Sequence, residues 1–580
     1  MWENVQRPTS NIQYPASSIQ YPVSRTMRHL KSVRIIPLGG VSEIGKNMTA
    51  LEYAGQILVI DCGLMFPNEE MLGVDIVIPD VAYLLDHADQ VQGIILTHGH
   101  KDHIGALPYV LRQLNVPVWG TKLTLGLVRA KLEEHGLSHN AELHLVEAGE
   151  RFNIGQFDIE AIQITHSIPD GLGLAVRFPI GTIVHTGDFK FDLTPIDGRL
   201  LDVSRFAKLG AEGVLLLLCD CTNVEKPGHV RSERAVGSMF EEVFARARGK
   251  IIIAAFASNI HRVQQVFDTA SRFDRKVAVV GRSMAQNVEI AQELGYLTIP
   301  EGTRIGVEDI PDLYPVEVVV MTTGSQGEPL SALTRIAMDD HKKVKVEKGD
   351  TVIISATPIP GNEDLVARTI NHLFKRGANV IYDPIAPVHV SGHGNREELK
   401  LMLSLTRPTY TVPVHGEHRH VAKYIELAEE MGIPRENVFA MEVGDVLEIG
   451  PSGVRLAGKV PAGDILVDGI GVGDVGDVVL RDRQHLAGDG IFIIVVGVDR
   501  TTGSVVAGPD VISRGFVYME EAEELVEEAK KVALETIEGL TMDAATEWST
   551  VKSDLRSALA KLLYSRTRRR PMVVPVIMEI

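Results

Sequence analysis

Cysteine is scarce in this chain of 580 residues, which contains only Cys62, Cys219 and Cys221. Three thiols do not make a disulfide framework, and a reducing compartment fits this composition. Cys219 and Cys221 alternate within an apolar stretch, which is typical of packing residues rather than of thiol ligands to a metal. The sequence therefore predicts a cytoplasmic protein without structural disulfides.

Long apolar runs are also missing, although 45% of the residues are hydrophobic. No run approaches the roughly 20 residues needed to cross a bilayer, and the polar N-terminus lacks the apolar segment of a secretory signal. We therefore expect no membrane contact, and we expect residues 1–31 to form a disordered extension. The remaining chain is too long for one core, so two or three domains are expected.

Basic residues are outnumbered, because 58 lysines and arginines face 76 aspartates and glutamates, for a net charge of -18. This balance argues against a protein that coats nucleic acid nonspecifically, since counterion release needs a basic face. It does not exclude a nuclease, which needs only a local positive funnel. The one dense basic run fits either a solvated helix end or an RNA contact. It consists of Arg566, Arg568, Arg569 and Arg570.

Histidine, by contrast, is concentrated in the segment His98-Gly99-His100-Lys101-Asp102-His103. The apolar run at residues 94–96 predicts a buried strand that ends just before this cluster. Imidazole nitrogens together with a carboxylate suit zinc, with manganese as the credible substitute. These four side chains are too close together in sequence to bind one tetrahedral ion. Two metals are therefore expected, one held by His98 and His100 and the other by Asp102 and His103.

Further ligands are expected at the ends of other predicted strands. His166 ends an alternating run, Asp188 follows the run at residues 182–187, and His415 closes the run at residues 410–414. A carboxylate has two oxygens, so Asp188 is the better candidate for a bridging ligand. The sequence thus predicts a two-metal centre with seven ligands: His98, His100, Asp102, His103, His166, Asp188 and His415.

These motifs, with Asp61 upstream, resemble the motif series of the metallo-β-lactamase superfamily. In that superfamily the counterpart of Asp61 orients a histidine ligand instead of binding metal. Asp220, His393 and His415 resemble the three additional motifs of the β-CASP nucleases. The segments 256–262, 281–283 and 323–329 narrow the resemblance to the bacterial ribonuclease J family, over about residue 32 to the end.

The strand and helix pattern from about residue 250 to 384 predicts a parallel doubly wound sheet. It carries no GxGxxG fingerprint, so a dinucleotide site is not supported. Since His415 lies beyond this block and the other ligands precede it, the block must be an insertion. The resemblance implies an α/β protein: a metallo-β-lactamase αββα sandwich, an inserted β-CASP domain and a small C-terminal α/β domain. We expect the sandwich at residues 32–232 and 389–460, the insertion at 233–388 and the C-terminal domain at 461–580.

The expected chemistry is hydrolysis of a phosphodiester. Two divalent ions about 3.5–4 Å apart can share a hydroxide that attacks phosphorus, and Asp102 belongs to this centre. His393, held by Asp220, is the candidate acid for the leaving oxygen, and binding phosphate is its alternative role. A phosphate loop is implied by the resemblance. It comprises His389, Val390, Ser391, Gly392 and His393.

The resemblance implies a metal-dependent ribonuclease with 5′-to-3′ exonuclease activity on 5′-monophosphate RNA and with endonuclease activity, acting in RNA maturation and mRNA decay. It also implies two zinc ions, or manganese in their place, and partners in RNA decay. The C-terminal domain, with amphipathic helices at 525–537 and 548–562 and a strand at 572–577, would support a dimer or tetramer. A structural calcium ion is implied at the backbone of Leu72 and Val74 with Asp468.

Other functions use parts of the same pattern. A DNA-processing β-CASP enzyme is the nearest alternative, and His415 argues against it because DNA-directed relatives commonly lack this histidine. A small-molecule hydrolase has no need for the insertion or for His393. A di-iron redox enzyme would be expected to have a carboxylate in place of His100. A non-catalytic RNA-binding subunit would be expected to lack some of the metal ligands that are present here.

Overall fold

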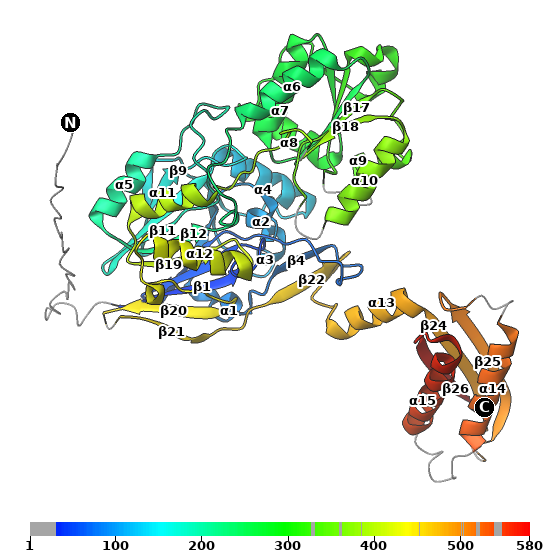
Figure 1. Cartoon of the computed structure of the whole chain (residues 1–580). Helices are drawn as coiled ribbons and strands as arrows, with labels where there is room; N and C mark the ends of the chain where they lie inside the picture. The colour runs from blue at the N-terminus through cyan, green and yellow to red at the C-terminus, as the bar shows by residue number, and fades with distance from the viewer. Residues whose placement is uncertain are drawn as a thin grey trace, which may run out of the picture.

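The computed structural model describes residues 31–325, 331–358, 362–383, 385–451, 453–499, 502, 504–517, 522–538 and 548–580. The expected disordered extension thus lies outside the described residues, apart from Lys31. Figure 1 shows two adjoining lobes and a smaller C-terminal unit set to one side of them. None of the described helices combines the length and apolar character of a membrane span.

Two β-sheets face each other in the first lobe. Their inner faces bury alternate side chains such as Ile35, Leu58, Leu174 and Leu216 in one shared core. The larger sheet has the order β21-β20-β1-β2-β3-β5-β6-β7 and the smaller has the order β19-β12-β11-β10-β9-β8. The larger sheet comprises β1 (Val33–Gly39), β2 (Met48–Tyr53), β3 (Gln56–Ile60), β5 (Val91–Ile95), β6 (Val118–Gly120), β7 (Leu143–Leu145), β20 (Asp445–Gly450) and β21 (Gly453–Lys459). The smaller comprises β8 (Arg151–Ile154), β9 (Phe157–Gln163), β10 (Leu172–Phe178), β11 (Gly181–His185), β12 (Val214–Asp220) and β19 (Tyr410–Val414).

Helices cover the outer faces of both sheets. Leu123 and Val128 pack with Val59 outside the larger sheet, and Phe206 and Tyr424 pack outside the smaller one. Each of these helices buries one apolar side, as an amphipathic helix on a sheet must. The predicted αββα sandwich is therefore confirmed. Its helices are α1 (Ala82–Asp86), α2 (Lys101–Ile104), α3 (Leu107–Val110), α4 (Lys122–Glu134), α5 (Val203–Glu212), α11 (Arg396–Thr406) and α12 (His418–Glu430).

The second lobe is the predicted doubly wound domain. Its sheet has the order β15-β14-β16-β13-β17-β18, and every neighbouring pair is parallel. Phe267 packs on one face with Ile253, and Ile336 packs on the other with Ile252, so both faces are buried. The strands are β13 (Ile251–Ala254), β14 (Lys276–Val280), β15 (Arg304–Ile305), β16 (Val318–Thr322), β17 (Thr351–Ile354) and β18 (Asn379–Tyr382). The helices are α6 (Arg234–Arg246), α7 (Ile260–Arg272), α8 (Arg282–Glu293), α9 (Ala332–Met338) and α10 (Glu363–Lys375).

The second lobe interrupts the first at one point of the smaller sheet. Strands β12 and β19 are parallel neighbours, with Leu216 opposite Tyr410 and Asp220 opposite Val414. The whole doubly wound sheet lies between these two strands in the sequence. An insertion follows directly from this topology, as the sequence predicted.

The C-terminal unit has a core of its own. Strand β24 lies between β25 and β26, and Phe492 and Ile494 pack against Leu555 and Leu559 of the helices on one face. The expected helices and final strand are present. The elements from residue 464 onward are β22 (Asp464–Asp468), β23 (Gly471–Val472), α13 (Asp477–Asp489), β24 (Ile491–Val498), β25 (Val505–Arg514), α14 (Glu523–Glu538), α15 (Trp548–Thr567) and β26 (Met572–Glu579). Strand β4 (Ile76–Pro79) of the first lobe pairs with β22.

Candidate metal centre

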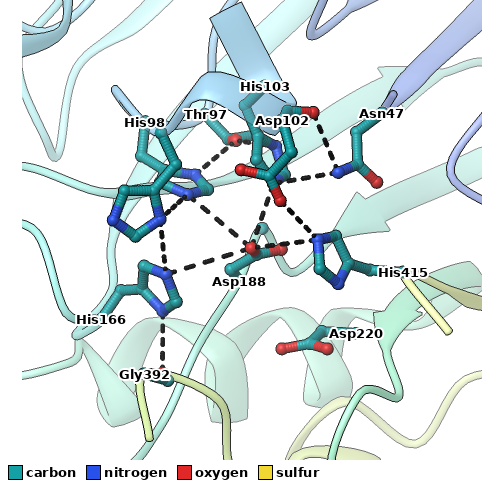
Figure 2. Close-up of polar contacts among 12 residues, drawn as sticks. Asn47, Thr97, His98, Asp102, His103, His166, Asp188, Asp220, Gly392 and His415 are labelled. Carbon is teal, nitrogen blue, oxygen red and sulfur yellow. Dashed lines mark hydrogen bonds and ion pairs between the residues drawn. The ribbon is translucent and has the colours of Figure 1, made fainter. Parts of the chain in front are cut away.

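The predicted ligands come together at one edge of the sandwich, where strands from both sheets end. His98 and His103 follow β5, His166 follows β9, Asp188 follows β11, and His415 follows β19. His415 has a left-handed backbone with φ 55°, a conformation that non-glycine residues adopt at a cost and that clusters at functional sites. Figure 2 shows the rings of His98, His103, His166 and His415 around the carboxylate of Asp188.

One group of donors consists of three imidazoles. Nε2 of His98 and Nε2 of His166 each lie 3.1 Å from Nδ1 of His100. Neighbouring ligands of a tetrahedral zinc ion with Zn–N bonds of about 2.0–2.1 Å lie roughly 3.4 Å apart. The spacing of these nitrogen atoms therefore fits a shared ion.

The second group combines imidazole with carboxylate. Nε2 of His415 lies 3.0 Å from Oδ2 of Asp102, and Nε2 of His103 lies 3.0 Å from Oδ2 of Asp188. Nε2 of His103 lies 3.7 Å from Oδ2 of Asp102. All four donors fall within 4.8 Å of one another, which suits a second ion of the same class.

Asp188 belongs to both groups through a single oxygen. Besides His103, its Oδ2 lies 3.6 Å from Nε2 of His415, 3.7 Å from Nε2 of His98 and 4.0 Å from Nε2 of His166. Its side chain is only 4% exposed. The structure thus places this carboxylate where the sequence analysis expected a bridging ligand.

The electrostatics of the two groups differ. Burial lowers the pKa of His98 and of His166, and it lowers the pKa of His100 to about 4, so these rings are neutral and ready to bind a cation. Burial would also lower the pKa of His415, but Asp188 and Asp102 outweigh it and raise that pKa to about 9. The pKa of His103 is likewise raised, because Asp188, Asp61 and Asp102 outweigh its burial.

Asp61 contacts the ring of His103 and the backbone of Thr97. Its Oδ2 lies 2.7 Å from Nδ1 of His103, and its Oδ1 accepts a hydrogen bond from the backbone N–H of Thr97 at 2.7 Å. The hydroxyl of Thr97 also reaches Asp61 and lies 3.0 Å from Nδ1 of His98. Asn47 Nδ2 lies 3.1 Å from Nε2 of His103. Sequence reasoning found Asp61 but missed Thr97 and Asn47, whose spacing carries no ligand signal.

Asp220 and His393 meet beside the two donor groups. Oδ2 of Asp220 lies 2.8 Å from Nδ1 of His393, whose side chain is 19% exposed. The ring of His393 lies 4.9 Å from that of His166 and 5.1 Å from that of His415, measured between centroids. Thr222, which the sequence analysis did not single out, donates its hydroxyl to Oδ1 of Asp220 at 2.7 Å and lies 2.8 Å from Nδ1 of His415.

The predicted phosphate loop lies against this centre. The carbonyl oxygen of Gly392 lies 2.8 Å from Nδ1 of His166, which leaves Nε2 of that ring for a metal. The Ser391 hydroxyl accepts a hydrogen bond from Asn223 at 2.8 Å, and Asn223 also donates to the carbonyl of His393. Val390 is buried, and burial together with the charge of Arg262 lowers the pKa of His389 to about 3.

The residues expected to hold calcium have a different partner. Arg483 donates to the carbonyl of Leu72 at 2.8 Å and pairs with Oδ2 of Asp468 at 2.5 Å. Val74 follows Leu72 by two positions in the chain and packs in a small apolar cluster with Val77 and Leu466. A guanidinium thus supplies the positive charge at this place, and calcium there stays a prediction that would require Arg483 to move.

The basic run near the C-terminus is engaged in local contacts. Arg566 pairs with Glu528 at 2.6 Å, Arg569 donates to the carbonyl of Phe516, and Arg570 stacks over the ring of Tyr564. These contacts favour the interpretation as a helix end over the interpretation as an RNA surface.

Metal binding should release protons, because His103 and His415 must be deprotonated to act as ligands. With its pKa raised to about 9, His415 is protonated at pH 7.5 without metal, so protons compete with the ion increasingly as pH falls below about 9, and the raised pKa of His103 acts in the same direction. We expect one to two protons to leave per chain. Zinc titration calorimetry in two buffers with different ionisation enthalpies measures this number, and His415→Ala should lower it. Heats that do not depend on the buffer would contradict the expectation.

Four family models match the chain. They are described as Metallo-beta-lactamase superfamily (residues 42–217), Ribonuclease J, beta-CASP domain (248–373), Zn-dependent metallo-hydrolase RNA specificity domain (377–441) and Ribonuclease J C-terminal domain (478–580). A crystal structure of a protein of unknown function from Enterococcus faecalis V583 superimposes with a TM-score of 0.51 at 14% identity, covering 72% of this chain and all of that one. At this identity the likeness supports the fold alone.

Individual relatives match along nearly the whole chain. Ribonuclease J2 of Bacillus subtilis (strain 168) is 45% identical over 553 residues, which cover 95% of this chain and 100% of that protein. Ribonuclease J 1 of Streptococcus pyogenes serotype M3 is 43% identical over 546 residues, covering 94% and 97%. With this identity over both full lengths, and with the αββα sandwich and its insertion in place, the chain belongs to the ribonuclease J family.

Proposed function

We propose that this protein is a metal-dependent ribonuclease that removes nucleotides from the 5′ end of 5′-monophosphate RNA and also cuts RNA internally. The single observation that carries this proposal is the shared Oδ2 of Asp188, which joins two donor groups directly beside the pair of Asp220 and His393. The match to an RNA specificity domain at residues 377–441 supports RNA as the substrate. Roles in RNA maturation and mRNA decay, with partners in decay, follow from the same assignment.

The two donor groups would hold two zinc ions, with manganese as the alternative. His98, His100 and His166 would bind one ion, Asp102, His103 and His415 the other, and Asp188 both. Bound there, the ions would lower the pKa of water toward about 7 and neutralise charge that develops on the phosphodiester. The chain itself contributes the fixed orientation of the ligands, through Asp61 and Thr97 on one side and Gly392 on the other.

His393 is the residue that would give a proton to the departing 3′-oxygen. Asp220 is buried at 1% exposure and lies 2.8 Å from Nδ1 of this ring, which fixes the orientation of the imidazole. Because the ring is partly exposed and adjoins His166 and His415, its free edge is accessible from the donor groups.

The phosphate loop would set the position of the 5′ end. Ser391 and Gly392 lie within two residues of His393, so a terminal phosphate held by this loop would lie close to the metal centre. Glycine beside serine lets backbone N–H groups approach phosphate oxygens. Release of single nucleotides from the 5′ end follows if the loop grips that phosphate, and internal cutting follows if the strand threads past it.

A DNA-directed β-CASP nuclease is the second candidate. His415 argues against it, because DNA-directed relatives commonly lack this histidine, and here it lies 3.0 Å from Asp102 within the second donor group. A comparison of labelled RNA and DNA strands of the same sequence separates the two candidates.

Two substitutions should distinguish the proposed role of Asp102 as a metal ligand from the proposed role of His393 as the acid. Asp102→Ala removes a ligand, so we expect loss of an ion and of RNA cleavage with the fold retained. His393→Ala should keep both ions but lower kcat by about 10²–10⁴-fold, the usual contribution of a positioned acid. Metal analysis and turnover of 5′-labelled RNA measure both effects. Full activity of Asp102→Ala in metal-stripped buffer would refute the mechanism.

The 5′ end of the substrate should control the rate. A pocket that fits one phosphate excludes the two additional phosphates of a 5′-triphosphate, so we expect triphosphate RNA to be degraded more slowly than monophosphate RNA. Degradation of matched transcripts, with a circular RNA as the control for internal cutting, provides the measurement. Equal degradation rates for triphosphate and monophosphate RNA would contradict the proposed pocket for a single 5′ phosphate.

Self-association through the C-terminal unit is the expected quaternary state. Ile493 lies opposite Ile512 and Val574 on the sheet face away from the helices, and Ile512 is 47% exposed. Exposed apolar patches of this kind mark interaction sites. Native mass spectrometry should show a dimer or tetramer with two ions per chain, and Ile512→Asp should yield monomers. A wild-type monomer at micromolar concentration would contradict this expectation.

A further inference from the structure

One arginine is completely buried where the two lobes join. Arg262 lies in the first turn of α7 and has 0% exposure, and it is among the largest fully buried side chains of the described residues. Burying a guanidinium is costly unless its donors are matched by acceptors in good geometry. The acceptors around Arg262 are therefore informative about what this residue does.

The guanidinium contacts three separate segments. Nε donates to Oε1 of Glu233 at 2.7 Å, and Nη2 lies 2.6 Å from the same oxygen. Nη1 donates to the carbonyl of Ser355 at 3.1 Å, to the Ser355 hydroxyl, and to the carbonyl of Val388 at 3.2 Å. The Ser355 hydroxyl in turn donates to the Val388 carbonyl at 2.5 Å. One side chain thus gathers acceptors that are more than 150 residues apart in the sequence.

These segments are the ones by which the chain passes between the lobes. Glu233 precedes α6, where the chain enters the inserted domain, and Val388 lies where it leaves. Glu233 is also tied to the sandwich, because its backbone N–H donates to Asp192 at 2.9 Å and its Oε2 lies 3.9 Å from Nζ of Lys190. Burial would raise the pKa of Glu233, but the charges of Arg262 and Lys190 outweigh it and lower that pKa, which keeps the pair ionised.

Val388 immediately precedes the phosphate loop. The loop is therefore held at its start by Arg262, near its middle by Asn223 through Ser391, and at its end by Asp220 through His393. Its Gly392 carbonyl orients His166. A shift at the Val388 carbonyl would move the backbone that faces a terminal phosphate.

We propose that Arg262 is a positioning residue that sets the phosphate loop against the metal centre and thereby determines recognition of the 5′-terminal phosphate. This inference rests on the proposed function. Arg262 touches neither the donor groups nor the loop's own N–H groups, so it acts through Val388 and Ser355. Displacement of a positioned group by about 1 Å can cost about 100-fold in rate, so modest movement of the loop suffices.

The test compares 5′-monophosphate, 5′-hydroxyl and circular RNA as substrates of purified wild type, Arg262→Gln and Arg262→Lys. The lysine variant keeps a buried positive charge for Glu233 but lacks the fork that reaches Ser355 and Val388 at the same time. We expect the ratio of kcat/KM for monophosphate over hydroxyl RNA to fall by roughly 10- to 100-fold in both variants. Cleavage of circular RNA should fall far less than cleavage of monophosphate RNA, because Asp220 still holds His393 at the far end of the loop, and the number of bound ions should be unchanged.

Two control variants separate positioning from stability. Lys250 and Asp350 form a buried ion pair at 3.2 Å at the N-terminal ends of the parallel strands β13 and β17, whereas Ser355 follows the C-terminal end of β17, so Lys250→Gln perturbs the same domain far from the loop. Tyr296→Phe removes a hydrogen bond to Asp170 that also crosses between the lobes. Neither control should change the monophosphate ratio.

The possible outcomes are distinct. A wild-type ratio in Arg262→Lys, or equal losses on all three substrates, would show that Arg262 only stabilises the fold. Should Arg262→Gln fail to fold, the lysine variant alone decides. A wild-type enzyme that does not distinguish the two RNA ends would overturn the proposed phosphate pocket, and the role of Arg262 with it.

Discussion

The parallel pairing of β12 with β19 is the constraint on which the rest of the structure depends. Thr411 donates its hydroxyl to the carbonyl of Leu217, which lies 194 residues earlier, and the strands continue in register to Asp220 and Val414. This pairing closes the sandwich around the inserted domain and sets His415 beside Asp220. Without it, the second donor group would lack an imidazole and Asp220 would lose the contact through Thr222. The metal centre is therefore a product of long-range sheet formation as much as of the local histidine cluster.

Much of this arrangement could be predicted because strand ends are visible in sequence. Apolar runs that stop at a histidine or an aspartate indicated where β5, β11 and β19 end. Strand β5 belongs to the larger sheet and β11 and β19 to the smaller one, so the packing of the two sheets brings these ends together. The inserted parallel sheet, predicted from its strand and helix pattern, and the αββα sandwich, implied by the family resemblance, are both confirmed. The seven expected ligands lie in two adjoining groups, and Asp188 of the second group also lies 3.7 Å from His98 and 4.0 Å from His166 of the first, although their role in binding metal stays a prediction.

Residues that act through a single hydrogen bond could not be predicted in this way. Thr97 and Thr222 are ordinary hydroxyls in sequence, and only the folded chain shows that each connects an aspartate to a histidine ligand. Arg262 stands in a helix that looks amphipathic, and its burial depends on acceptors from three distant segments. The basic run near the C-terminus shows the opposite relation between sequence and structure. Its charges are conspicuous in the sequence, but Arg566, Arg569 and Arg570 contact groups within the C-terminal unit.

Arg483 joins the first lobe to the path that leads into the C-terminal unit, because it lies on α13 and binds Leu72 and Asp468. A covalently attached cation cannot be extracted by a chelator or diluted away, and a guanidinium stays charged at any pH that the protein survives. In this structure, the contact between the first lobe and α13 is therefore made without a divalent cation. Under the proposed function, depletion of metal would abolish catalysis while leaving the contacts of Arg483 with Leu72 and Asp468 in place.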